Sequence, residues 1–200
     1  MAEEPFLLAL ERSAPVPGGG SAAAYAASVG LALLEKIVRL ESERPRPAPE
    51  ERPVWEALLG RVRRSAEIFR RLREEDSEAY VRLAEARRSK DERAIHGAWE
   101  QAIACPVGIM EEAHEALLLA REAGERCKGH LVADVLVVLQ LLRAGWRGAY
   151  HIASANLGMA ATLPTWKGDL TMPAEISTRA ENVFVAAEKA ILARIMHETP

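Results

Sequence analysis

Apolar residues recur three and four positions apart along most of the chain, and no segment alternates apolar and polar residues as a strand does. Ala, Leu, Glu and Arg, which favour helices, dominate these segments. The pattern predicts a short helix over about residues 4–12 and longer ones over about residues 20–41, 54–89, 91–123, 131–162 and 173–197. We therefore expect an all-α fold, a bundle of about five long helices, in a single domain over residues 1–200.

Proline and glycine set the expected helix ends. Ser13–Gly20 reads as a Pro/Gly loop, and Glu43–Pro53, with four prolines, reads as a linker and not a helix. Pro106 is expected to kink the helix over 91–123, and Gly124 to end it. Pro173 lies at or near the first position of the last helix, where proline is well tolerated.

Small residues crowd the start of the helix over residues 20–41, which lets another helix approach it closely. Gly145, Gly148 and Gly158 in the helix over 131–162 indicate close packing or bends. Long apolar helices in a chain of this size often need a partner. We therefore expect an oligomer, most simply a symmetric homodimer.

Two aspartates stand where the helical pattern calls for apolar residues. Trp55, Val62, Phe69, Asp76 and Leu83 follow one another at intervals of seven, so Asp76 falls on the stripe that should be buried. Asp134 interrupts a run that is otherwise apolar on nearly every side. A carboxyl group kept from water can hold a raised pKa and exchange protons near neutral pH. Pairing with one of the many arginines is the structural alternative for either residue.

Three consecutive glycines precede the helix over residues 20–41, in the segment Pro17-Gly18-Gly19-Gly20-Ser21. Glycine permits backbone conformations that other residues avoid, and backbone N–H groups at a helix N-terminus attract anions. The segment lacks the Gly-Lys-Ser/Thr ending of a phosphate-binding Walker loop. It is interpreted either as a ligand-binding loop or as a tight turn that allows close packing.

Composition narrows the function classes. The 200 residues carry a net charge of −3 with a pI near 6.0, which argues against a general nucleic-acid binder. We expect no membrane span, because charged residues or glycine interrupt each apolar run, and no secretory signal, because the N-terminus is acidic. Cys105 and Cys127 form no disulfide framework, which favours a reduced, cytoplasmic protein.

No metal site is expected from the histidines. Glu111, His114 and Glu115 share one helical face, and a Glu-x-x-His pair is half of a di-iron helix signature. The second pair that such a site needs is missing from the sequence.

The glycine segment, read on as Pro17-Gly-Gly-Gly-Ser21-Ala-Ala-Ala, resembles the formiminotransferase-cyclodeaminase C-terminal family, which includes cyclodeaminases and methenyltetrahydrofolate cyclohydrolases. Weaker similarities follow in the family's order over roughly residues 10–165. They are Glu75-Asp76-Ser-Glu-Ala-Tyr80, the mid-helix proline of Ala104-Cys-Pro106, Ala133-Asp134-Val135, and Gly148-Ala-Tyr-His151-Ile-Ala-Ser-Ala-Asn156-Leu157.

The resemblance implies a dimeric all-α enzyme of folate one-carbon metabolism, with a tetrahydrofolate derivative as substrate and no tightly bound cofactor or metal. The reaction would be that of a formiminotetrahydrofolate cyclodeaminase or a methenyltetrahydrofolate cyclohydrolase. Asp76 and Asp134 would move protons. The residues that would bind the substrate are Gly18, Gly19, Gly20, Ser21, His151 and Asn156.

Three positions depart from the family's pattern. The lysines that usually follow the glycine-loop helix are absent from Val38–Pro47, Ala133 replaces a serine, and His151 replaces the first of two asparagines. The lost lysines are expected contacts to an anionic or heteroaromatic ligand. The alternative is therefore a diverged, non-catalytic helical dimer that binds a ligand or a protein partner.

Overall fold

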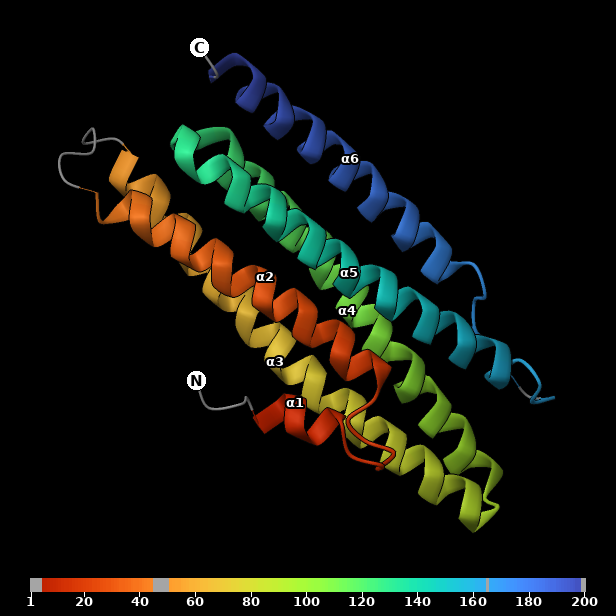
Figure 1. The fold of residues 1–200 in the computed structure, drawn as a ribbon. Coiled ribbons are helices and arrows are strands. Elements are labelled where there is room, and N and C mark those ends of the chain that lie inside the picture. The colour runs from red at the N-terminus through yellow and green to blue at the C-terminus, as the bar shows by residue number, and fades with distance from the viewer. Residues whose placement is uncertain (1–4, 45–50, 165, 199–200) are drawn as a thin grey trace.

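The computed structural model of the protein describes residues 5–44, 51–164 and 166–198, and the described residues form helices and no strands (Figure 1). The short helix α1 covers Pro5–Leu10. The long helices are α2 (Gly19–Ser42), α3 (Glu51–Ser89), α4 (Glu92–Arg126), α5 (Gly129–Ala160) and α6 (Met172–Glu198). The predicted all-α fold with five long helices is confirmed.

The long helices run alternately up and down the bundle (Figure 1). α2 packs on α3 and α5, α4 packs on α3 and α5, and α6 covers α4 and α5 from outside. One end of the bundle therefore holds the start of α2 with the ends of α3 and α5. The opposite end holds the end of α2 with the starts of α3 and α5.

The stripe predicted on α3 is buried except around Asp76. Trp55, Val62, Phe69 and Leu83 are buried in the common core, whereas Asp76 is half-buried. Tyr80, one turn further, is 49% exposed. The apolar seam is thus interrupted over one turn, which leaves room for a cavity.

Small residues join α2 to α5, as the sequence predicts. A Cβ atom added to Gly145 would lie 2.9 Å from the Cβ atom of Ala27, and one added to Gly148 would lie 3.1 Å from that of Ala23. These two glycines therefore let the helix backbones approach closely. Gly158 has no such role, because a Cβ atom there would meet nothing within 4 Å.

Two predicted helix ends are wrong. α3 begins at Glu51, inside the expected linker, because Pro53 then lies in the first turn, where a missing N–H costs no helical hydrogen bond. Residues 45–50 of that linker lie outside the described part of the chain. Gly124 does not end α4, which continues to Arg126. A Cβ atom at Gly124 would lie 2.6 Å from Cδ1 of Ile191, so this glycine admits α6.

α2 and α5 are each long and apolar enough to cross a membrane by length and composition, contrary to the expectation from the charge pattern. Half of the apolar window of α2 and 44% of that of α5 are buried inside the bundle. Core helices of a soluble bundle have the same length and composition, so the feature is weak evidence for a membrane span.

Candidate functional site

A cavity of about 220 Å³ lies at the N-terminus of α2, where α2, α3, α4 and α5 meet. The loop before α2 and its first residues form one wall, and single turns of α3, α4 and α5 form the others. The lining residues are Pro15, Val16, Gly18, Gly19, Gly20, Asp76, Ala79, Tyr80, Leu83, Ala102, Ile152 and Asn156.

Asp76 is held against the first turn of α2 by Ser21. The backbone N–H of Ser21 donates to Asp76 Oδ2 at 2.8 Å, and the Ser21 hydroxyl lies 2.9 Å from the same oxygen. The hydroxyl is also within 3.1 Å of the Arg73 carbonyl and of Ser77 Oγ. A carboxylate at a helix N-terminus is favoured by the helix dipole. The anion that the α2 N-terminus binds is therefore Asp76 itself.

Burial raises the pKa of Asp76 above its usual value, and the hydrogen bonds from the Ser21 side chain and backbone only partly oppose this. Among the described residues, no arginine, lysine or histidine forms an ion pair with Asp76. A carboxyl group that is half-buried, unpaired and open to a cavity can both accept and donate a proton.

Gly20 makes the contact between α2 and Asp76 possible. A Cβ atom on Gly20 would lie 2.1 Å from Asp76 Oδ1 and 2.6 Å from its Cγ. No glycine in the described part of the chain has a positive φ, so the expected unusual backbone conformation is absent. Gly20, and to a lesser degree Gly19, whose Cβ atom would lie 3.0 Å from Ile152 Cδ1, are explained by the space that a side chain would fill, and not by backbone freedom.

Asn156 closes the cavity from α5. Its Nδ2 donates to the backbone carbonyl of Ala102 on α4 at 2.6 Å. Both residues line the cavity together with Asp76. The carboxyl group and the carboxamide group thus face one cavity from different helices.

The structure brings together most of the residues that the sequence singled out. Gly18, Gly19, Gly20, Asp76 and Asn156 line the cavity, and the buried Ser21 holds Asp76 without lining it.

Two of the expected site residues lie elsewhere within this chain. Asp134 is eighteen residues before Ile152 on α5, which places it about 27 Å away along the helix axis, towards the opposite end of the bundle. It is half-buried, not fully buried as its neighbours predict. His151 is exposed and contacts the Tyr150 ring instead, because it is turned about 100° from Ile152 on the helix.

Seven of the lining residues were not predicted as site residues, Tyr80 and Ile152 among them. Tyr80 follows Asp76 by four positions on α3, and Ile152 precedes Asn156 by four on α5, so each shares a helical face with a residue that was predicted. The i, i+4 spacing from Asp76 and from Asn156 could have identified Tyr80 and Ile152 from the sequence.

Cys105 lies near the same carboxyl group, but its thiol is a poor nucleophile because it forms little thiolate. Burial is the main cause that raises its pKa to about 11, and the negative charges of Asp76 and Glu75 add to it. In the described part of the chain, no three His, Cys, Asp or Glu side chains are grouped so that they could hold a metal ion.

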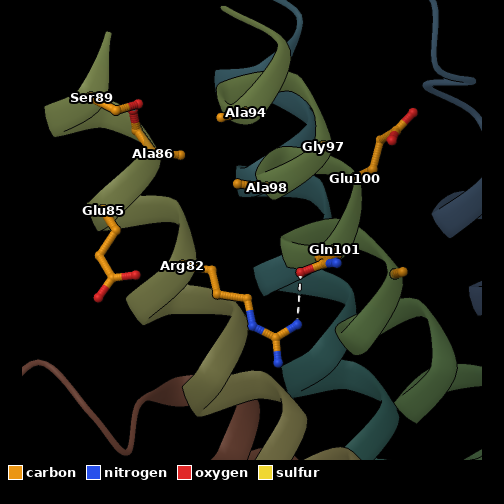
Figure 2. Close-up of a pocket in the computed structure, with 10 residues that line it drawn as sticks. Arg82, Glu85, Ala86, Ser89, Ala94, Gly97, Ala98, Glu100 and Gln101 are labelled. Carbon is orange, nitrogen blue, oxygen red and sulfur yellow. Dashed lines mark hydrogen bonds between the residues drawn. The ribbon is translucent and has the colours of Figure 1, made fainter. Parts of the chain in front are cut away.

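A larger groove of about 700 Å³ runs between α3 and α4 beyond the cavity (Figure 2). Its floor is rich in alanine, and Arg82 reaches across it from α3 to Gln101 Oε1 at 3.0 Å. Arg82 also contacts Glu78 Oε2 at 2.5 Å, and Glu100 points away from the groove (Figure 2). With its one arginine already paired, the groove offers shape but little convergent chemistry. The smaller cavity is therefore the better candidate site.

Comparisons with known proteins identify the family and the fold. The chain matches the formiminotransferase-cyclodeaminase family over residues 3–162. Its fold is similar to the crystal structure of formiminotetrahydrofolate cyclodeaminase from Thermotoga maritima at 2.80 Å resolution, with a TM-score of 0.83 and 16% sequence identity. The similarity covers 98% of this chain and 96% of that one. A search of curated protein sequences found no match. Because the family match spans well over half of the residues, the chain belongs to the formiminotransferase-cyclodeaminase family.

Proposed function

We propose that this protein is a folate one-carbon enzyme, a formiminotetrahydrofolate cyclodeaminase or a methenyltetrahydrofolate cyclohydrolase, with Asp76 as the group that moves protons. The observation that carries the proposal is the Asp76 carboxyl group, which burial keeps at a raised pKa, Ser21 fixes through one oxygen, and a cavity exposes. Family membership and the shared fold support it.

Both reactions pass through one carbon held between two nitrogen atoms. In hydrolysis, water adds to the methenyl carbon while the Asp76 carboxylate takes a proton from the water. The bond from that carbon to one nitrogen then breaks as the added hydroxyl releases its proton to solvent and becomes the formyl oxygen, and the Asp76 carboxylic acid returns the first proton to that nitrogen. One group with a raised pKa can serve both steps in turn.

Deamination uses the same proton transfers on a different substrate. A folate nitrogen attacks the formimino carbon and loses its proton to Asp76. This attack closes the ring, and Asp76 returns the proton to the nitrogen of the formimino group, which enters the reaction protonated and leaves as ammonia. The protein must place one carboxyl group beside the reacting carbon in either case, and Asn156 lies close enough to orient the ligand.

The cavity would take only the reacting end of the substrate, because a tetrahydrofolate is larger than 220 Å³. The α3–α4 groove lies one turn further along the same two helices and offers room for the rest. Gly19 and Gly20 would contact the ligand through backbone atoms. Asp134 and His151 would join such a site only from a second subunit, so a homodimer is part of the proposal. A cytoplasmic location stays a prediction.

The decisive experiment follows the absorbance of 5,10-methenyltetrahydrofolate at neutral pH with purified protein, and in parallel the release of ammonia from 5-formiminotetrahydrofolate. We expect turnover of one of them well above the spontaneous rate, and its loss in Asp76→Asn. Asp91→Asn is the matched control, because Asp91 caps α4 and asparagine caps equally well.

Turnover that survives in Asp76→Asn would contradict the assigned role. Tetrahydrofolate binding without turnover of either substrate would favour the diverged, non-catalytic alternative, for which the missing lysines are the specific observation.

A further inference from the structure

α4 carries a proline deep in its interior, at a position that faces the core. Pro106 is the fifteenth residue of this helix and is buried. In an α-helix, the N–H of residue 106 would donate to the carbonyl of residue 102. Proline has no N–H, and its ring crowds that carbonyl. The Ala102 carbonyl therefore lacks its helical hydrogen-bond donor.

Asn156 supplies the missing donor from the neighbouring helix. Its Nδ2 lies 2.6 Å from the Ala102 carbonyl oxygen. A carbonyl can only accept, so the nitrogen of the carboxamide must face α4 and the oxygen must face away from it. No hydrogen bond to Asn156 Oδ1 comes from the part of the chain that the structure describes. The oxygen is thus left available to a ligand in the cavity that Asn156 lines.

We propose that Pro106 is a positioning residue for the candidate site, acting through the Ala102 carbonyl to fix the Asn156 carboxamide. The inference rests on the proposed function in one respect: Asn156 Oδ1 would accept a hydrogen bond from an N–H group of the folate ring system. The proline costs α4 a hydrogen bond, and the bond that replaces it holds a side chain of the site.

Replacing Pro106 with alanine restores the helical N–H. The backbone N–H of the new alanine would donate to the Ala102 carbonyl and compete with Asn156 for it. The carboxamide would then be free to rotate. The helix itself should become more stable, because an interior proline is strongly unfavourable in a helix.

The test is a double-mutant cycle on kcat/KM with the folate that the enzyme turns over. We expect Asn156→Ala to lower kcat/KM by about tenfold, as loss of one ligand hydrogen bond does. Pro106→Ala should lower it several-fold while Tm stays the same or rises. If Pro106 acts through Asn156, the double variant should be no worse than Asn156→Ala. Multiplying losses, or full activity in Pro106→Ala, would overturn the inference.

Pro53→Ala is the matched control. It makes the same substitution in the first turn of α3, where no helical hydrogen bond is restored. We expect it to leave kcat/KM unchanged. A loss as large as that of Pro106→Ala would show that any proline change perturbs the bundle, and would count against a specific link to Asn156.

A second readout does not depend on turnover. The chain has two asparagines and two glutamines, so its side-chain amide NMR spectrum holds four NH₂ pairs, and Asn156→Ala identifies one of them. We expect the NH₂ protons of Asn156 to exchange slowly with solvent. This slow exchange should be lost in Pro106→Ala and kept in Pro53→Ala. An unchanged pair in Pro106→Ala would overturn the inference. The expected change in a protein that turns over neither folate would uphold the Pro106–Asn156 link while the proposed function fails.

Discussion

Two carboxyl groups are shielded from water at opposite ends of the bundle, and their surroundings differ. Glu41, at the end of α2, has a side chain only 3% exposed. Its Oε1 accepts from the Lys128 backbone N–H at 2.8 Å, and its Oε2 forms an ion pair with Arg44 Nη1 at 3.1 Å. Asp76, beside the start of α2, pairs with no such cation among the residues that the structure describes, and it opens on a cavity.

The difference separates a structural carboxylate from a chemical one. Glu41 joins the end of α2 to the start of α5 through the Lys128 backbone N–H and pairs with Arg44. Asp76 accepts two hydrogen bonds from Ser21 on one oxygen, and its other oxygen lies against Gly20. Burial alone therefore does not mark a catalytic candidate. A missing cation and an adjoining cavity do.

The largest expected effect is that of Asp76→Asn on catalysis. General acid–base catalysis contributes about 10²- to 10⁴-fold, so we expect kcat/KM to fall by about that factor. The fold should not suffer, because asparagine keeps an oxygen acceptor for Ser21 and no longer places a charge in a half-buried site. Activity and Tm measured on the same preparation check both parts. A large drop in Tm would make Asp76 structural, like Glu41.

The pH dependence gives a sharper version of this prediction. Because the folded state raises the pKa of Asp76, it binds this proton more tightly than the unfolded state does. The wild type should therefore lose stability relative to Asp76→Asn as pH rises from about 4 through the raised pKa. If the carboxylate is the base, kcat/KM for methenyl hydrolysis should fall as pH drops through that same pKa. An equal pH dependence of Tm in both proteins would contradict the shift.

Glu41→Gln should show the opposite pattern. Removing the charge leaves Arg44 Nη1 without its carboxylate, although Nη2 still pairs with Glu51, so we expect a loss of about 2 kcal/mol in the free energy of unfolding. The substrate KM should stay unchanged, because Glu41 is remote from the cavity. Urea denaturation measures the effect. The control is Glu43→Gln, whose pair with Arg39 is exposed and should contribute less than about 0.5 kcal/mol.

Gly20→Ala tests the close approach of α2 to Asp76. The added methyl group would displace the carboxyl group from Ser21, so we expect about a tenfold loss of kcat/KM and a loss of about 1–3 kcal/mol in stability. Gly158→Ala is the matched control, because a methyl group there meets nothing within 4 Å. It should stabilise the helix by up to about 1 kcal/mol. Equal activity in the two variants would show that Gly20 is not needed for the site.

The sequence predicted the helices well because their apolar stripes are long and regular. It also singled out Asp76, which the structure places beside the cavity, since a charge on a buried stripe is visible in the spacing. The sequence could not show that Asp134 lies far from the cavity. Its position in an apolar run does not indicate how far along the bundle axis it lies from the other site residues. Gly124 was wrong as a helix end for a related reason. Its role depends on Ile191 of α6, a contact that no local pattern encodes.

The smallest expected effect concerns the reactivity of Cys105. Because Cys105 lies near Asp76, the alkylation rate of its thiol depends on the charge of that carboxyl group. Burial and the nearby negative charges raise the pKa of Cys105 to about 11, so almost no thiolate is present at neutral pH. Alkylation by iodoacetamide at pH 7.5 should therefore be much slower than for a free cysteine. Burial raises the pKa of Cys127 as well, so it should not react sooner. Because Asp76 is one cause of the raised pKa, Asp76→Asn should speed alkylation of Cys105 slightly and leave Cys127 unchanged. Rapid labelling of Cys105 in the wild type would contradict the burial on which the description of this end of the bundle rests.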